Sequence, residues 1–108
     1  MKTRWNIFAA TALLGLAMAT ASAAEALAQE SGCLDCHALD RNGIGPAFRV
    51  VAGRYREIPA ARAALIETVK HGGKENWIEV SHGAPMPPYS PRLSDEQIQQ
   101  LVDWILSL

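Results

Sequence analysis

The two cysteines of this 108-residue chain are separated by two residues and followed at once by a histidine, in the pattern Cys33-x-x-Cys36-His37. Cysteines at this spacing can form a disulfide, a redox-active dithiol or part of a zinc site. A disulfide between Cys33 and Cys36 would close a very small loop and would therefore restrain little of the unfolded chain. A thioredoxin-like dithiol lies in a strand–helix–strand context, and the sequence shows no strand pattern of useful length.

A structural zinc site requires four protein ligands. Besides the two cysteines, the chain offers three histidines, His37, His71 and His82. The last two are 11 residues apart, which is outside the short histidine spacing of finger-type zinc sites. Zinc binding therefore fits the sequence poorly.

The pattern Cys-x-x-Cys-His is typical of covalent haem attachment. Two thiols about one helical turn apart can each add to one of two neighbouring haem vinyl groups, and the adjacent imidazole can reach the iron from the same side. We predict that Cys33 and Cys36 attach one haem c and that His37 binds its iron. A disulfide or another metal site remains the alternative.

The second axial ligand is predicted to be Met86, the only methionine after the first 23 residues. It lies in residues 84–88, where three prolines stiffen the backbone on both sides. A thioether held in this way is suited to presenting its sulfur at one distance, although Met86 could instead fill the core. Ligation by histidine and methionine raises the reduction potential. His71 and His82 are the rival ligands.

The start of the chain predicts a secretory signal peptide. Lys2 and Arg4 precede an apolar run of 13 residues, 7–19, and small residues follow. A membrane-spanning helix needs about 20 apolar residues, so a retained anchor is the alternative interpretation. We predict cleavage after Ala23, which divides the chain into a signal peptide, 1–23, and one domain, 24–108.

The charge of that domain bears on its partners. Residues 24–108 hold 8 basic and 11 acidic side chains, a formal net charge of −3. Nucleic-acid binding requires a basic excess, so nucleic acid is not expected as a partner. No membrane span is expected in the exported domain either.

Helical signals dominate the domain. The best of them predicts a helix over 95–107, because Ser94 and Gln97 form a capping box and apolar residues follow at helical spacing. A second helix is predicted over 59–71, ending at two glycines, and shorter ones over 48–55 and 25–31. The loops 42–46 and 83–88 interrupt them.

So few short helices give a thin core, and something large and apolar is expected to fill the middle of the domain. The sequence thus predicts a small all-α fold.

Together these features resemble the class I c-type cytochromes, specifically the small bacterial mono-haem kind, over nearly all of residues 24–108. The likeness rests on the segments 32–37 (Gly-Cys-x-x-Cys-His), 45–48 (Gly-Pro-Ala-Phe), 85–88 (Pro-Met-Pro-Pro) and 101–108. It implies the small cytochrome c fold, three to four helices wrapped around one covalently attached haem.

The resemblance also implies the roles of several residues. Cys33 and Cys36 would form thioether bonds, His37 would be the proximal ligand and Met86 the distal ligand. The carbonyl of Pro46 would accept a hydrogen bond from the non-ligating nitrogen of the His37 ring.

The resemblance further implies that the first and last helices cross near Gly32, on the side of the last helix that carries Trp104. Gly32 would then permit the close approach of the two backbones.

Trp77 is the candidate for an indole N–H near a haem propionate, as in relatives that carry a tryptophan shortly before the ligand methionine. It stands nine positions before Met86, and residues 78–82 look like a local insertion. Plain burial of Trp77 with a hydrogen bond is the alternative. Tyr55 and Tyr89 are further candidates for the same position.

We therefore predict an exported, periplasmic, monomeric cytochrome c that transfers single electrons between redox partner proteins, such as a dehydrogenase, a reductase or an oxidase. It is not expected to be an enzyme, because no acid–base or nucleophile constellation is visible. The alternatives are an electron-accepting haem subunit of one periplasmic dehydrogenase and a haem sensor or enzyme with an open sixth iron position. The third alternative is a haem-free interaction domain that is stabilised by a disulfide.

Overall fold

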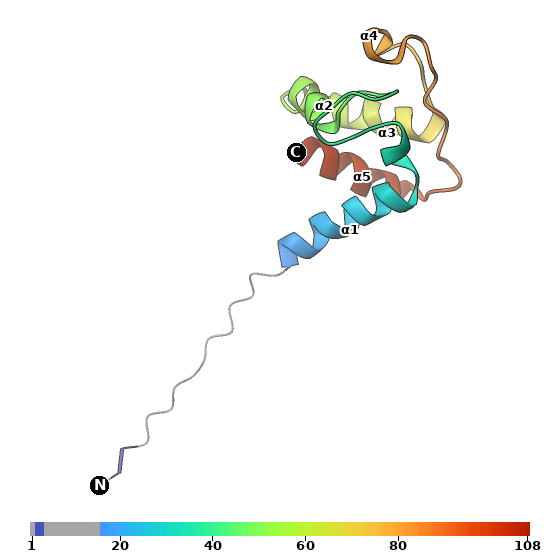
Figure 1. The fold of residues 1–108 in the computed structure, drawn as a ribbon. Coiled ribbons are helices and arrows are strands. Elements are labelled where there is room, and N and C mark those ends of the chain that lie inside the picture. Colours follow the sequence, from blue (N-terminus) through green and yellow to red (C-terminus); the bar gives the residue numbers. More distant parts are fainter. Residues whose placement is uncertain (1, 4–15) are drawn as a thin grey trace.

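The computed structural model describes residues 2–3 and 16–108, and its described part is helical (Figure 1). Most of the predicted signal peptide, 1–23, lies outside the described residues. The helices are α1 (Leu16–Glu30), the 3₁₀ turn η1 (Cys33–Asp35), α2 (Phe48–Tyr55), α3 (Ala61–His71), α4 (Ile78–Ser81) and α5 (Asp95–Ser107). Within this described part the only extended pairing is an isolated bridge between Gly73 and Met86.

Helix α5 forms as the capping box predicts. The Ser94 hydroxyl accepts a hydrogen bond from the Gln97 amide at 3.1 Å, and the Gln97 side chain accepts one from the Ser94 amide at 2.9 Å. The predicted apolar stripe is buried, with Ile98, Leu101 and Trp104 all in the core. Helix α5 contacts α1, α2 and α3, so it is the element around which the domain is assembled.

Helix α1 packs on α5 through small side chains. Ala24 and Ala28 are buried in the same core cluster as Leu101 and Trp104. The predicted close approach at Gly32 is wrong: a Cβ there would meet only the Asp35 carboxylate, at 3.3 Å. Glycine suits position 32 because its φ is +83°, a conformation that side chains disfavour.

Helix α2 has its predicted bounds, whereas α3 begins at Ala61, two residues later than predicted from Pro59. A tight turn precedes it, in which the Ala61 amide donates to the Ile58 carbonyl at 3.0 Å. Helix α3 ends at Gly72, whose φ is +78° and whose added Cβ would overlap the Met86 carbonyl oxygen. Glycine is therefore required at this position.

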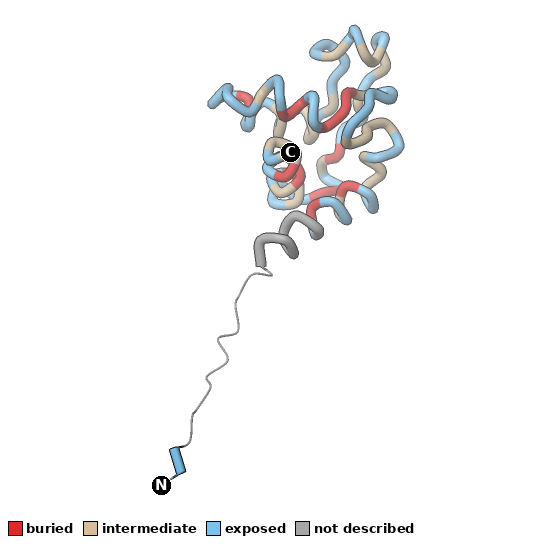
Figure 2. Tube along the Cα trace, turned by 60° about the vertical axis from the view of Figure 1, so that its left-hand side comes forward, coloured by how far each residue is buried: buried red, intermediate tan, exposed pale blue. Residues whose placement is uncertain are grey.

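Two ion pairs join α3 to α5. Arg62 reaches Asp103 at 2.7 Å, and Lys70 reaches Asp95 at 3.3 Å. The buried residues, red in Figure 2, lie where the helices meet. Within the described range, the helices are all too short or too polar to cross a membrane.

The chain between α3 and α5 is mostly irregular. The segment predicted to be a local insertion, 78–82, contains a single helical turn, α4, none of whose residues is buried. At its end His82 has a positive φ of 52°.

Candidate functional site

A cavity of about 410 Å³ lies between the cysteine segment, α2, α3, α5 and the chain that follows α3. Its volume falls within the roughly 300–1,000 Å³ that is usual for cofactor and small-molecule sites. Apolar side chains such as Phe48, Val51 and Leu101 form much of its wall. The sequence predicted that something large and apolar fills the middle of the domain, and the cavity has that position.

All six residues predicted for the site line this one cavity: Cys33, Cys36, His37, Pro46, Trp77 and Met86. They come from segments up to 53 positions apart in the sequence, because Cys33 and Met86 belong to opposite ends of the domain. The cavity therefore brings together residues that lie far apart in the sequence.

The two cysteines lie on one tight turn. The Cys36 amide donates to the Cys33 carbonyl at 3.3 Å and the His37 amide donates to the same oxygen at 2.9 Å. Both cysteines are free thiols, which does not support the disulfide alternative. Partial burial raises the pKa of the Cys33 thiol above its ordinary value. Two thiols one turn apart suit addition to a pair of vinyl groups.

The ring of His37 is held on three sides. Its Nδ1 lies 2.7 Å from the Pro46 carbonyl oxygen, and its face stacks on Phe48 with ring centroids 4.9 Å apart. Gly45 also lies so close to the ring that an added Cβ would be 2.8 Å from each ring nitrogen. The predicted hydrogen bond to Pro46 is thus present in the structure.

These contacts determine which nitrogen of His37 is available. A carbonyl oxygen can only accept, so Nδ1 carries the proton and Nε2 keeps its lone pair. Burial lowers the pKa of His37, and the hydrogen bond to Pro46 partly opposes this effect. The imidazole is therefore neutral at pH 7, which is the form that binds a metal.

Met86 is fixed by its backbone as well as by its prolines. Its amide donates to the Gly73 carbonyl at 2.7 Å and its carbonyl accepts from the Gly73 amide at 3.1 Å. The side chain is partly buried and packs against the core. The end of α3 therefore anchors the loop that carries the Met86 thioether, a contact that the sequence did not reveal.

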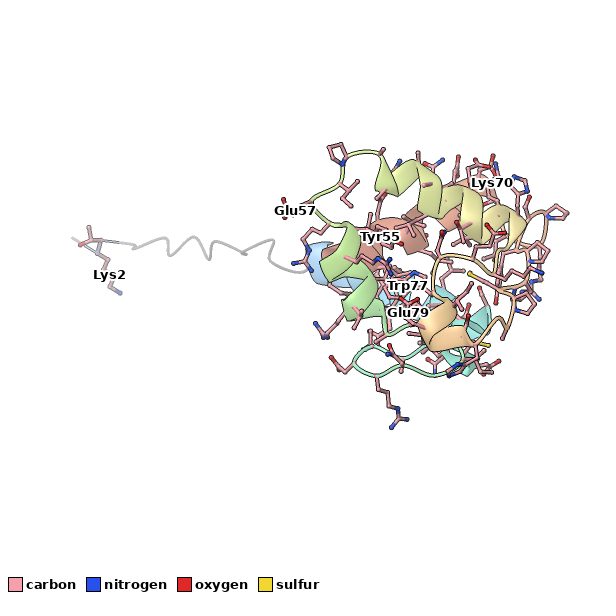
Figure 3. The ribbon with its side chains drawn as sticks, turned by 90° about the horizontal axis from the view of Figure 1, so that it is seen from above. Lys2, Tyr55, Glu57, Lys70, Trp77 and Glu79 are labelled. Carbon is pink, nitrogen blue, oxygen red and sulfur yellow. The ribbon has the colours of Figure 1, made fainter. Side chains whose placement is uncertain are left out.

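Trp77 contributes to the cavity wall and meets Tyr55, with ring centroids 6.1 Å apart in an edge-to-face arrangement. Figure 3 shows Trp77 beside Tyr55 of α2. The Arg54 guanidinium lies over the Trp77 ring at 4.3 Å. Sequence reasoning missed Arg54, because no local pattern indicates that α2 will meet residues 76–79.

Tyr89, the other tyrosine considered for the site, is buried at the cavity wall, and burial raises the pKa of its phenol. The rival histidine ligands do not line the cavity. His71 contacts Glu67 at 3.1 Å on the exposed side of α3, and His82 is exposed in the turn after α4. Within residues 2–3 and 16–108 no three histidine, cysteine or acidic side chains are grouped as a metal site.

Three independent comparisons agree on the relatives of this chain. Residues 21–108 match the cytochrome c family. Cytochrome c-551 of Allochromatium vinosum is 43% identical over 82 residues, which cover 76% of this chain and 82% of the relative. Cytochrome c-552 of Nitrosomonas europaea is 37% identical over 109 residues, covering 100% of this chain and 99% of the relative.

The solved structures show the same similarity. The crystal structure of wild-type Nitrosomonas europaea cytochrome c552 superposes with a TM-score of 0.69 at 32% identity, covering 78% of this chain and 98% of that chain. The class 1 cytochrome MtoD from Sideroxydans lithotrophicus ES-1 gives a TM-score of 0.65 at 36% identity, covering 80% and 92%.

Proposed function

We propose that this chain, which belongs to the cytochrome c family, is a periplasmic carrier that passes single electrons between redox partner proteins through a haem held by His37 and Met86. It is a small class I c-type cytochrome with the small cytochrome c fold. It carries one covalently attached haem c, and it is an electron carrier rather than an enzyme. We propose in addition that His37 and Met86 are the iron ligands, that Cys33 and Cys36 attach the haem, and that the protein is periplasmic.

The observation that carries the proposal is the meeting of four side chains in one cavity. Cys33, Cys36, His37 and Met86 all line it. Two thiols, one neutral imidazole and one thioether are the donor set that a covalently attached, six-coordinate haem requires. The residues present therefore fit the group that the family implies.

Haem bound there supplies a one-electron ferric–ferrous couple. In the proposal, Cys33 and Cys36 tether the haem and His37 donates its Nε2 lone pair to the iron. Pro46 keeps the His37 ring in one tautomer and orientation, which supports this role. The backbone bonds between Gly73 and Met86 support the proposed role of Met86, because they restrain the backbone that carries the thioether.

The apolar wall has its own part in electron transfer. Side chains such as Phe48, Val51 and Leu101 line the cavity and would shield a haem bound there from water, and a low local dielectric favours the less charged oxidation state of a buried redox centre. With both His37 and Met86 as ligands, the iron would have no position left for a substrate. Both features support transfer of electrons rather than catalysis on a bound molecule.

The proposed role of Trp77 is to direct its indole N–H toward a propionate of the haem. Its position in the cavity wall supports this assignment. The contact with Tyr55 and the stacking of Arg54 restrict the orientation of the indole ring.

A spectrum tests the proposal directly. Protein produced in a haem-attaching host should give a reduced-minus-oxidised spectrum with sharp haem c bands, and its ferric form should show the sulfur-to-iron charge-transfer band in the red. Acid–acetone extraction should leave the colour with the polypeptide. Haem bands without the red band would contradict Met86 as ligand, and a colourless polypeptide after extraction would contradict the thioether bonds.

A further inference from the structure

The segment between α3 and Met86 is a loop closed at its base and held at its tip. At the base, the Gly73 and Met86 backbones exchange two hydrogen bonds of 2.7 and 3.1 Å. Residues 74–85 lie between these ends, and several of them form part of the cavity wall. Met86, the proposed distal ligand, follows directly. Motion of this loop is therefore coupled to the position of the thioether.

The tip of the loop has little to hold it by packing. None of the residues of α4 is buried, and Ile78 is 55% exposed. A single helical turn is not stable by itself. Loops with few buried contacts open locally at low free energy. Residues 74–85 therefore need a specific contact with the rest of the domain.

Arg54 of α2 provides that contact through three groups of the loop. Its guanidinium lies 4.3 Å over the Trp77 ring and 3.3 Å from the Glu79 carboxylate. It also donates to the Asn76 carbonyl at 3.5 Å. An arginine can stack on an aromatic face and bond to oxygens in its own plane simultaneously, whereas a lysine cannot.

We propose that Arg54 is a positioning residue that holds residues 74–85 against the cavity and thereby controls how readily the Met86 sulfur leaves the iron. This inference rests on the proposed function, because it needs Met86 as a ligand. Arg54 itself does not line the cavity. Its effect is transmitted through Trp77 and the loop backbone to the Gly73–Met86 bridge.

The test replaces Arg54 and measures ligand replacement at the iron. Imidazole added to the ferric protein competes with the Met86 sulfur, so its affinity reports the free energy of opening the loop. We expect Arg54→Ala to raise the imidazole affinity about three- to tenfold, since exposed ion pairs and exposed cation–π contacts are each weak. Arg54→Lys should give an intermediate increase, because it keeps the charge and loses the planar stacking.

A matched control is available on the same helix. Arg49 forms an ion pair with Asp40 at 2.6 Å, and Arg49→Ala removes an arginine and an ion pair without affecting the loop. Its imidazole affinity should equal that of the wild type. If Arg54→Ala does not fold, Glu79→Gln removes the ion pair alone and should raise the affinity less than threefold.

Amide hydrogen exchange separates this inference from the proposed function. Amides in residues 76–84 should exchange faster in Arg54→Ala than in Arg49→Ala. A wild-type ferric spectrum without the red band would refute Met86 as a ligand. In that case the amide hydrogen exchange of residues 76–84 would still test whether Arg54 holds the loop. If the amides of residues 76–84 exchange at the same rate in Arg54→Ala as in Arg49→Ala, Arg54 does not hold the loop. If they exchange faster but the imidazole affinity is unchanged, Arg54 holds the loop without controlling how readily the Met86 sulfur leaves the iron.

Discussion

Gly45 lies against the ring of His37, so close that an alanine Cβ at position 45 would overlap the ring carbon between the two nitrogens. The same ring stacks on Phe48. A glycine and an aromatic ring thus both restrain the imidazole, while the Pro46 carbonyl accepts a hydrogen bond from its Nδ1–H. The size of residue 45 is therefore tied to the orientation of the proposed ligand.

Replacing Gly45 by alanine should displace the His37 ring or the 42–46 loop. Forcing an extra carbon into a packed site costs about 1–3 kcal/mol, and we expect a loss of this size in the free energy of unfolding together with a shifted potential. Denaturant unfolding and voltammetry check the two effects. Gly53→Ala is the matched control: an added Cβ at this helical glycine meets nothing within 4 Å, so it should instead stabilise by about 0.5–1 kcal/mol. Equal effects of both substitutions would refute the steric explanation.

Replacing Met86 by alanine should open one axial position if its sulfur binds the iron. We expect a lower reduction potential, loss of the ferric red band, and binding of added imidazole or cyanide far more tightly than in the wild type. Ile78→Ala, an exposed substitution in the same segment, should leave all three unchanged. A Met86→Ala protein with the wild-type voltammogram would exclude Met86 as a ligand.

Replacing Asp103 by asparagine should lower the stability in a pH-dependent way. The Arg62 guanidinium, which donates to Asp103 at 2.7 and 3.0 Å, holds the pKa of that carboxyl below its ordinary value of 3.8. A lowered carboxyl pKa stabilises the fold above the unfolded value, and this stabilisation is lost as the pH falls through the folded pKa. Both side chains are about half exposed, so the effect should be small.

Thermal unfolding near neutral pH should therefore give a slightly lower Tm for Asp103→Asn than for the wild type, and the difference should vanish well below pH 3.8. Glu57→Gln is the control, since Glu57 is exposed and forms no ion pair with any described residue. A Tm difference for Asp103→Asn that persists at low pH would show that the ion pair is not its cause.

Export should remove the first 23 residues. The intact mass of haem-loaded protein recovered from the periplasm should then correspond to a chain that begins at Ala24. Ala24 is only 1% exposed and packs in the core cluster, so the first residue of the mature domain would already contribute to the fold. Recovery of the whole chain in the membrane fraction would instead favour a retained anchor.

Local patterns were sufficient for much of the fold. The capping box and apolar spacing predicted α5 with its observed bounds, and Gly72 correctly marked the end of α3. These features depend on neighbours within one or two turns, so the sequence carries the necessary information. The start of α3 was predicted two residues early, because a proline is compatible both with the first helical turn and with the turn that precedes it.

Contacts between segments that are distant in the sequence could not be predicted from local patterns. The close approach predicted at Gly32 is absent, and α1 meets the core through Ala24 and Ala28 instead. A glycine can indicate a positive φ or a close contact, and only the packed structure distinguishes these. Residues 78–82 were predicted to be a local insertion, but the contact of Glu79 with Arg54 depends on where α2 lies.

The sequence by itself determined which residues can be proposed as the donor set, since Cys33, Cys36 and His37 stand at the spacing of one motif and Met86 stands between prolines. The tertiary structure alone decided that these residues share one cavity, that Gly45 packs on His37 and that Arg54 reaches Trp77. The physical reason is range: capping and turn preferences act over a few residues, whereas the cavity exists only once α5 has brought α1, α2 and α3 together.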